Sequence, residues 1–364
     1  MIINDIITYL EGIIPLDYQE SYDNSGLQVG QKQQPLKGAL ICLDVTEEVI
    51  EEAIQEGCNL IISHHPIIFK GLKKLTGQNY VARIVELAIK NDIAIYAAHT
   101  NLDSMDFGVS KHIADKIGLT RCNILSPKKN SLKKLVTFCP VEHADKVRNA
   151  IFEAGAGHIG NYSHCSFNSQ GNGTFKAGKN TNPFVGEQEE LHTEPEVKIE
   201  VIFPIHKSRE VIRQLIQSHP YEEVAYDIYP LENVYSKVGL GMMGELETEM
   251  HPEEFLSLLK EKLQLKVIKH TELLSKPIKK VALCGGSGSF LIHTAIAQQA
   301  DIYITGDIKY HDFFDADGKI ILVDIGHYES EKFTKELLKT LITKKFPNFA
   351  PVISKVNTNP IYYR

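Results

Sequence analysis

Short apolar runs alternate with amphipathic stretches over residues 37–125. The apolar runs cover 37–43, 59–63 and 93–98, and such runs are typical of strands buried on both faces. Between them, 46–56 and 81–90 place apolar residues at helical spacing. Strands that alternate with helices in this way predict βαβ units and a largely parallel sheet.

The pattern changes after a turn-rich, basic segment at 126–131, which we interpret as a linker. Beyond it the expected order is strand, helix, strand, strand, helix, strand, which is typical of a ferredoxin-like module. The segment 168–196 is rich in Gly, Asn and Glu and predicts an exposed loop. The strands are expected at 134–139, 163–168, 197–203 and 223–229, and the helices at 144–153 and 208–217.

The α/β pattern returns after residue 245. Helices are expected at 252–263 and 330–341, and strands at 280–284, 301–305 and 319–323. The predicted fold class is therefore α/β, with a core of two similar α/β halves interrupted by an inserted ferredoxin-like domain. The two halves are residues 1–125 and 246–364, and the insert is residues 126–245.

An internal repeat connects the two halves of this core. Residues 40–44 and 53–63 align with 282–286 and 295–305 at a constant offset. Any two βαβ units could resemble each other to that extent. A further pair, 98–103 and 326–331, is harder to explain in that way, because both segments follow a predicted strand and present His-x-x-x-carboxylate.

Charge and composition narrow the class of protein. The 39 Lys and Arg against 46 Asp and Glu give a net charge of −7, which argues against a general binder of nucleic-acid backbones. The six cysteines include no C-x-x-C pair, so neither a disulfide framework nor a zinc ribbon is expected. The amphipathic N-terminus lacks the basic start of a signal peptide, and no apolar run is long enough to span a bilayer. We expect a soluble cytoplasmic protein.

Histidines and carboxylates follow the predicted strands of both halves. His64 and His65 come directly after the strand at 59–63, and ligands in parallel sheets collect at such strand ends. A His and a carboxylate four residues apart on a helical turn lie on one face and can hold one ion. These nitrogen and oxygen donors suit Zn, Fe or Mn. Taken singly, such residues are more often polar loop residues or surface ion pairs. The two spaced pairs are His99 with Asp103 and His327 with Glu331.

Two weaker signals lie in the second half. The Gly-rich turn at 284–290 could cradle a phosphate, but it lacks the lysine of a P-loop, and tight packing explains it equally well. Asp307 and His311 follow the strand at 301–305 and could act as general acid or base, or be ordinary polar loop residues.

Together with the segment 22–27, these motifs resemble the family named GTP cyclohydrolase I type 2 homolog, also called NGG-interacting-factor-like. Tyr22 stands where many members have Trp. The resemblance implies two divalent ions per subunit, with zinc the first choice and iron or manganese as alternatives. It also implies a toroidal homohexamer, with the insert similar to PII/CutA-type modules. By this resemblance the metal ligands are His64, His65, Asp103, His327 and Glu331, and His99 is a ligand or a neighbour of one.

Two functions follow from the resemblance and the motifs. The first is a metal-dependent hydrolase acting on a nucleotide or a pterin-like cyclic amide, with His99, Asp307 and His311 as candidate catalytic residues. The second is a non-enzymatic metal-handling or regulatory protein whose PII-like module binds an unknown small-molecule effector. Membrane and nucleic-acid partners are not expected.

Overall fold

The computed structural model describes residues 1–364 and divides into two compact units. The core unit comprises 1–127 and 236–364, and the inserted unit comprises 128–235. The second boundary lies before β10 (Gly239–Met250), whereas the sequence placed it at 245. The physical reason is that β10 pairs along its length with strands of the core, and its Gly- and Met-rich start carries no clear strand pattern.

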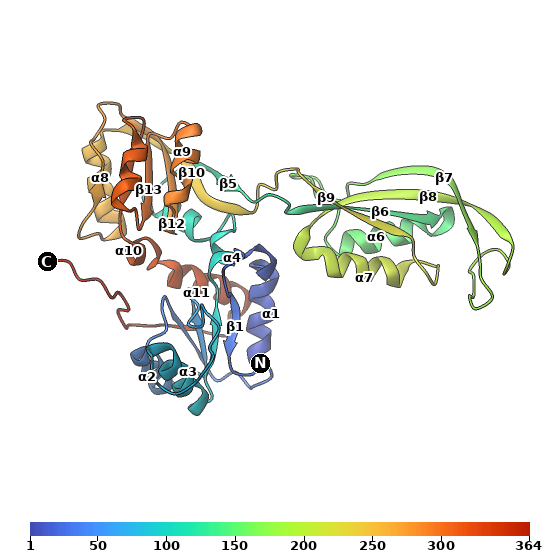
Figure 1. Ribbon diagram of the computed structural model, residues 1–364, viewed down its shortest axis with the longest axis horizontal. Coiled ribbons are helices and arrows are strands. Elements are labelled where there is room, and N and C mark those ends of the chain that lie inside the picture. The colour runs from blue at the N-terminus through green and yellow to red at the C-terminus, as the bar shows by residue number, and fades with distance from the viewer. The chain divides into compact units, whose positions relative to one another are not determined.

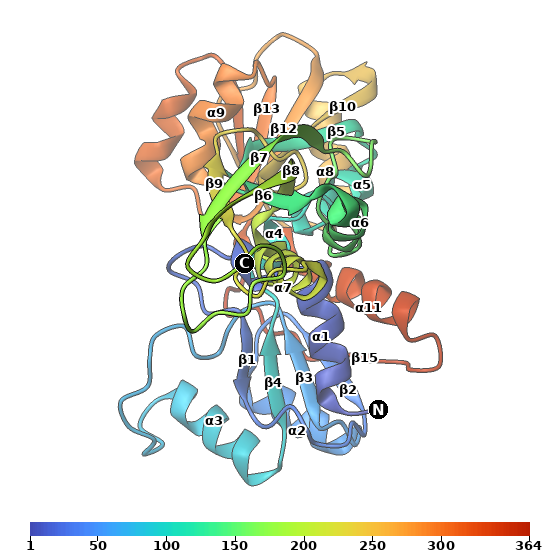
Figure 2. The same cartoon turned by 90° about the vertical axis from the view of Figure 1, so that its right-hand side faces the viewer.

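The first half of the core unit supplies four strands of a five-stranded sheet in the order β1-β4-β3-β2-β15, and β15, from the C-terminal end of the chain, pairs in parallel with β2. Figure 2 shows β1, β4, β3 and β2 side by side. The three central strands are parallel, as the alternating pattern predicts. The strands are β1 (Gly26–Val29), β2 (Ala39–Cys42), β3 (Leu60–Ser63), β4 (Ala94–Ala97) and β15 (Val352–Ile353).

The second sheet has six strands in the order β11-β14-β13-β12-β10-β5, and its edge strand β5 comes from the segment before the inserted unit. Its three central strands are again parallel, while β10, β5 and β11 run antiparallel to their neighbours. The remaining strands are β5 (Thr120–Pro127), β11 (Lys269–His270), β12 (Ile278–Ser287), β13 (Ile302–Gly306) and β14 (Ile321–Asp324).

The two sheets repeat one arrangement. In each, three parallel strands in chain order are followed by an antiparallel edge strand, β1 beside β4 and β11 beside β14. The aligned segments of the internal repeat therefore occupy equivalent strands. A short helix follows the third parallel strand in both halves, α4 (Thr100–Asp103) after β4 and α10 (His327–Glu331) after β14. Figure 1 shows α4 and α10 between the two sheets.

Helices cover both sheets, and a shared apolar core joins the halves. Ile6, Leu10, Ile62, Phe255 and Leu338 belong to one buried cluster. None of the helices is both long and apolar enough to cross a membrane. The longer helices of the core are α1 (Ile3–Ile13), α2 (Glu47–Gln55), α3 (Tyr80–Lys90), α5 (Val109–Ile117), α8 (Pro252–Leu263), α9 (Ile292–Ala297) and α11 (Thr334–Lys345), and its 3-10 helices are η1 (Leu16–Tyr18), η4 (Ser289–Leu291) and η5 (Tyr310–Ala316).

The final helix expected at 330–341 is instead two helices. Glu331 ends α10, and α11 begins at Thr334. The short break separates α10 from α11. Helix α11 then packs its own apolar face into the core through buried Leu338 and Ile342. The sequence pattern merges the two helices because the helical spacing of apolar and polar residues continues across the break.

The inserted unit has the element order β-α-β-β-α-β and a sheet in the order β7-β8-β6-β9. Buried Val197, Ile199 and Val201 of β8 share an apolar cluster with residues of both helices, so the helices cover one face of the sheet. The elements are β6 (Leu132–Pro140), η2 (Val141–His143), α6 (Ala144–Glu153), β7 (Phe167–Lys176), β8 (Leu191–Pro204), η3 (Ile205–Lys207), α7 (Ser208–Ser218) and β9 (Tyr226–Leu231).

The exposed loop expected at 168–196 is wrong. Most of that segment forms a long antiparallel hairpin of β7 and β8, paired from Phe167 with Glu200 to Lys176 with Leu191. β7 is largely exposed, so its sequence shows no apolar alternation and includes two glycines. Backbone pairing with β8, rather than side-chain burial, makes it a strand.

Replacing Asp301 with Asn is expected to destabilise the core at neutral pH. Burial acts to raise the pKa of Asp301, but hydrogen bonds from the Lys276 ammonium and the Lys280 and Lys279 amides lower it below its usual range. The charged form thus stabilises the fold above the unfolded pKa, and this contribution is lost as pH falls through the folded pKa. Urea unfolding should show a loss of about 1–3 kcal/mol at pH 7.

The same comparison at acid pH supplies the control. The difference between Asp301→Asn and wild type should shrink as the pH falls through the lowered folded pKa of Asp301, because the wild-type carboxylate then becomes protonated. Asp315→Asn, on the exposed face of η5, should change little at either pH. An equal loss at both pH values would contradict the role given to the Asp301 charge.

Candidate metal centre

Four imidazole rings and two carboxylates gather where α4 and α10 meet. The ring centroids of neighbouring histidines are 4.9–5.4 Å apart. One half of the core supplies three rings and one carboxylate, and the other half supplies the rest. The cluster consists of His64 and His65 after β3, His99 just before α4, Asp103 at the end of α4, and His327 and Glu331 at the two ends of α10.

Every histidine of the cluster is held by its Nδ1 atom. In each case Nδ1 lies 2.7 Å from an oxygen that accepts its hydrogen bond, so Nδ1 is a donor and Nε2 remains for a second proton or a cation. Such support is typical of metal-ligating histidines, where it fixes both tautomer and ring orientation. The acceptors are the Ala98 carbonyl for His64, Asp44 for His65, Asp23 for His99 and Asp307 for His327.

The free Nε2 atoms converge on Glu331. His65 Nε2 lies 3.0 Å and His327 Nε2 3.1 Å from Glu331 Oε2, and His64 Nε2 lies 3.6 Å from Oε1. The Nε2 atoms of His65 and His327 are 3.2 Å apart. Two nitrogen lone pairs at that distance repel each other unless a proton or a cation lies between them. The arrangement therefore favours a positive charge at this point.

Three buried polar atoms of the cluster have no hydrogen-bond partner, namely His64 Nε2, Asp103 Oδ1 and Glu331 Oε2. The first two lie 3.6 Å from each other. His64 is fully buried, and leaving such atoms without a partner costs free energy. A bound cation would supply the missing interaction. Two groups of donor atoms are close enough to hold an ion, one formed by His64, His65 and His99 and the other by His65, His327 and Glu331.

The charges of the cluster are strongly coupled. Burial and the neighbouring Glu331 carboxylate raise the pKa of Asp103 to about 7. Burial acts to lower the pKa of His65 and His327, but their carboxylate partners raise it to about 10 and about 11. Burial would also raise the pKa of Glu331, yet the surrounding imidazoles hold it well below its usual value. Protons thus compensate the carboxylates here, and a divalent cation could replace them.

The residues predicted from sequence divide into two groups. His64, His65, His99, Asp103, His327 and Glu331 come together as described, and Asp307 joins them by accepting the hydrogen bond from His327. That bond lowers the pKa of Asp307. His311 is not brought to the cluster. It is exposed on η5, where its ring contacts Tyr310 and Phe314.

Sequence reasoning missed two carboxylates that orient the histidines. Asp44 follows the end of β2 as His64 follows β3, and this shared position at the carboxyl edge of the sheet was the available signal. Its second oxygen accepts a hydrogen bond from the Thr358 hydroxyl at 2.7 Å. Asp23 lies within the segment 22–27 that carried the family resemblance, and it also accepts from the Thr100 amide at 3.1 Å.

The Gly-rich turn after β12 packs directly against the cluster. A Cβ added at Gly286 would lie 2.2 Å from Glu331 Oε1, and its φ of +64° is strained for other residues. The Gly286 amide donates to the Ser330 hydroxyl at 2.9 Å. Close packing beside Glu331 therefore explains this glycine.

The model of the Duf34/NIF3 (NGG1p interacting factor 3) family matches residues 1–360. The chain belongs to the Duf34/NIF3 family. The resemblance inferred from the sequence motifs is thereby confirmed.

Relatives in the Duf34/NIF3 family match the chain over its full length. It is 42% identical to the GTP cyclohydrolase 1 type 2 homolog of Bacillus subtilis, covering 98% of this chain and 97% of that protein. The homolog of the same name from Staphylococcus aureus is 36% identical over all of both chains. Among solved structures, a Bacillus cereus protein related to NIF3 has a TM-score of 0.85 at 41% identity, covering 100% of this chain and 99% of that one. A Staphylococcus aureus protein has a TM-score of 0.79 at 34% identity with the same coverage.

Replacing Asp44 with Asn is expected to weaken metal binding by about 10–100-fold. The amide oxygen can still accept a hydrogen bond from His65 Nδ1. The negative charge that makes the imidazole a stronger metal ligand is lost. Competition with a chromophoric zinc chelator measures the change. Glu51→Gln, on the exposed side of α2, is the control and should bind zinc as wild type does. Equal affinity in the Asp44 variant would contradict its role in orienting His65.

Proposed function

We propose that the chain holds two divalent metal ions in this cluster and acts as a metal-dependent hydrolase. The observation that carries the proposal is the set of four imidazoles, each held through its Nδ1 atom. Three of their Nε2 atoms lie within 3.6 Å of the Glu331 or Asp103 carboxylate. Such a set has no evident use in stabilising the fold, because it buries charge that must be compensated.

The donors support one ion at His65, His327 and Glu331 and a second at His64 and Asp103, with His99 as a further ligand or a neighbouring base. Imidazole and carboxylate donors without thiolate suit zinc, with iron and manganese as alternatives. Cys284 has its pKa raised to about 12 by burial and by the Asp103 and Glu331 carboxylates, so it remains a neutral thiol.

Paired divalent ions acidify water and stabilise negative charge on oxygen, which is what hydrolysis requires. The chain's own residues would orient these donors and bring a proton acceptor. Asp307 and Asp44 fix the rings of His327 and His65. His99, whose Nδ1 proton is held by Asp23, offers Nε2 as a base if it is not a ligand. We propose a nucleotide or a pterin-like cyclic amide as the substrate class.

Turnover by the metal-loaded protein tests the hydrolase. The protein is loaded with zinc, iron or manganese and assayed with GTP and with a panel of cyclic amides. Asp103→Ala should abolish turnover, whereas Asp106→Ala, which loses only an exposed ion pair with Lys237, should retain it. Unchanged turnover in the Asp103 variant, or no turnover by wild type with any metal, would reject the hydrolase and leave metal binding to be tested by metal content.

A metal-handling or regulatory role is the second candidate. It is favoured by a cavity in the inserted unit that shares no residue with the metal cluster. This role predicts that bound metal transfers readily to an acceptor, with no substrate turned over. Transfer to a chromophoric chelator within seconds would support it, and slow transfer together with turnover would support the hydrolase.

We also propose that the chain assembles as a homohexamer. Exposed aromatic side chains on η5 support self-association, since Tyr310 and Phe314 are 75% and 67% exposed. Light scattering of the purified protein should give six times the 40.9 kDa mass of one chain. A monomeric mass at micromolar concentration would contradict this assembly.

A further inference from the structure

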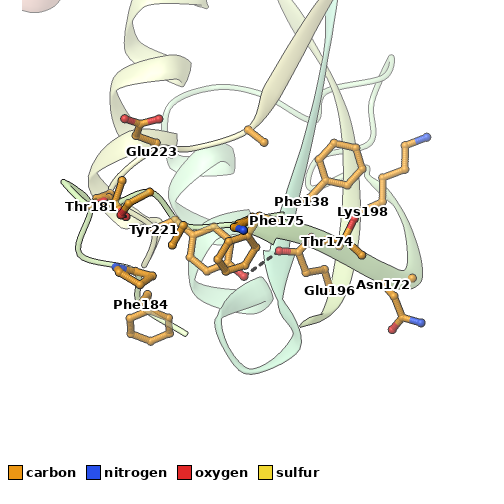
Figure 3. A pocket seen from close by; sticks show the side chains of 18 of the residues that line it. Phe138, Asn172, Thr174, Phe175, Thr181, Phe184, Glu196, Lys198, Tyr221 and Glu223 are labelled. Carbon is orange, nitrogen blue, oxygen red and sulfur yellow. Dashed lines mark hydrogen bonds between the residues drawn. The ribbon is translucent and has the colours of Figure 1, made fainter. Parts of the chain in front are cut away.

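The inserted unit contains a cavity of about 700 Å³, within the range of small-molecule sites. Residues of β6, β7 and β8 line it, together with the connection after β7 and the segment after α7. Val197 and Ile199 of β8 face the helices, so Glu196 and Lys198 point to the opposite face of the sheet, where the cavity lies. Figure 3 shows this cavity.

Aromatic rings from four separate segments line the cavity. The Phe175 and Tyr221 ring centroids are 6.1 Å apart, and those of Phe184 and Tyr221 are 6.3 Å apart. The fourth ring is Phe138 of β6. Figure 3 shows Phe175 beside Tyr221. Tilted aromatic rings around one space provide apolar contact and also attract a cation through their faces.

A buried carboxylate lies among these rings. Glu196 is only 8% exposed. Its Oε1 accepts a hydrogen bond of 2.8 Å from the Tyr221 hydroxyl, drawn as a dashed line in Figure 3, and no protein group donates to Oε2. Burial and this hydrogen bond raise the pKa of Tyr221, so the hydroxyl stays a neutral donor. A buried carboxylate charge with only one neutral hydrogen-bond partner costs free energy unless a cation compensates it.

The backbone of β7 makes room for this carboxylate. A Cβ added at Gly173 would lie 2.2 Å from Glu196 Oε2 and 2.7 Å from its Cδ. Any side chain at residue 173 would therefore displace the Glu196 carboxylate. The glycine in the middle of a strand, which weakens the strand by itself, is explained by the position of Glu196.

The cations of the cavity do not neutralise Glu196. The Lys198 ammonium pairs with Glu200, and Lys176 is exposed at the end of β7 without an ion pair to Glu196. Two further carboxylates, Glu222 and Glu223, lie on the lining. The charge distribution disfavours phosphate and carboxylate ligands. A single buried carboxylate among aromatic rings is also a poor site for a metal ion, which needs several donors.

We propose that this cavity binds a small organic ammonium ion, a primary amine carried on an apolar or aromatic body. The ammonium group donates to Glu196 Oε2, and the body packs against Phe175, Phe184 and Tyr221. The backbone N–H of Asn182 donates to the Glu222 carboxylate at 2.9 Å. This hydrogen bond connects the loop between β7 and β8 to the opposite side of the cavity. The site is independent of the proposed hydrolase, because none of its residues belongs to the metal cluster.

Three probes of similar shape test the charge that the cavity selects. They are 2-phenylethylamine, neutral 2-phenylethanol and anionic 3-phenylpropionate, titrated calorimetrically into the full-length protein. The amine should bind at least ten times more tightly than either of the others. Equal binding of the amine and the alcohol, tighter binding of the acid, or no binding of the amine at about 10 mM would overturn the proposal.

Substitutions identify the residue that is responsible for the selectivity for the amine. Glu196→Gln keeps an acceptor for Tyr221 but loses the charge, and it should weaken amine binding at least tenfold while leaving the weak binding of the alcohol unchanged. Glu194→Gln is the matched control, because Glu194 lies on the same strand and the same face, pairs with His192 and does not line the cavity. It should bind the amine as wild type does.

A second variant, Glu196→Asp, tests the role of the charge if Glu196→Gln does not fold. Glu196→Asp keeps the charge on a shorter side chain, so the amine should still bind more tightly than the alcohol. Loss of that preference, or an unchanged affinity in a folded Glu196→Gln variant, would overturn the assignment of Glu196. Metal content should be the same in all of these variants, which separates this test from that of the metal centre.

Discussion

Replacing Glu331 with Gln is expected to remove most of the bound metal. The carboxylate approaches the Nε2 atoms of three histidines within 3.0–3.6 Å, so it compensates charge at both proposed ion positions. Glutamine has the same shape but no charge, and its amide group can donate to the Nε2 lone pairs and stabilise the metal-free cluster instead. Affinity should fall at least about 100-fold, and elemental analysis after purification should find fewer than about one ion per chain instead of about two.

The control for Glu331 lies on the same short helix. Glu329 accepts a hydrogen bond from Asn359 at 3.0 Å and does not face the cluster, so Glu329→Gln should keep its metal. Hydrolytic turnover, if present, should be lost in Glu331→Gln and retained in Glu329→Gln. Full metal content in a folded Glu331→Gln variant would mean that the cluster is not the metal site.

Removing metal from the wild-type protein with a chelator should lower its thermal stability substantially. The cluster buries Glu331, which is 3% exposed, beside Asp103 and unpartnered His64 Nε2, and a bound cation compensates these charges. An ion present at about a thousand times its Kd stabilises a folded protein by about 4 kcal/mol. For a unit of this size, the midpoint of thermal unfolding should fall by roughly 8–16 °C.

Differential scanning calorimetry with and without chelator measures this shift. Adding back zinc, iron or manganese one at a time should restore the midpoint, and the most effective metal identifies the preferred ion. The Glu331→Gln variant should respond little to chelator, because it binds little metal. A wild-type midpoint that does not move when elemental analysis shows the metal to be gone would contradict the link between the ions and the stability of the core.

The central parallel strands and most of the helices can be predicted from the amino-acid pattern alone. Strands buried on both faces appear as continuous apolar runs, and β2, β3 and β4 lie within the predicted ranges. The same local signals placed His64, His65, His99 and His327 just beyond the ends of predicted strands. Because carboxyl ends of parallel strands share one edge of a sheet, His64, His65 and His99 were expected to lie together. His327 follows a strand of the other sheet, and only the family resemblance implied that it joins them.

Tertiary structure decided what depends on pairing between distant segments. β5, β10 and β15 are strands because a partner accepts their hydrogen bonds, and the exposed β7 is a strand for the same reason. Likewise, nothing local assigns Asp23 to His99 or Asp44 to His65, and those contacts fix which ring nitrogen is free. A hydrogen bond between residues far apart in sequence has no local pattern, so only the folded chain reveals which donors remain available for a metal.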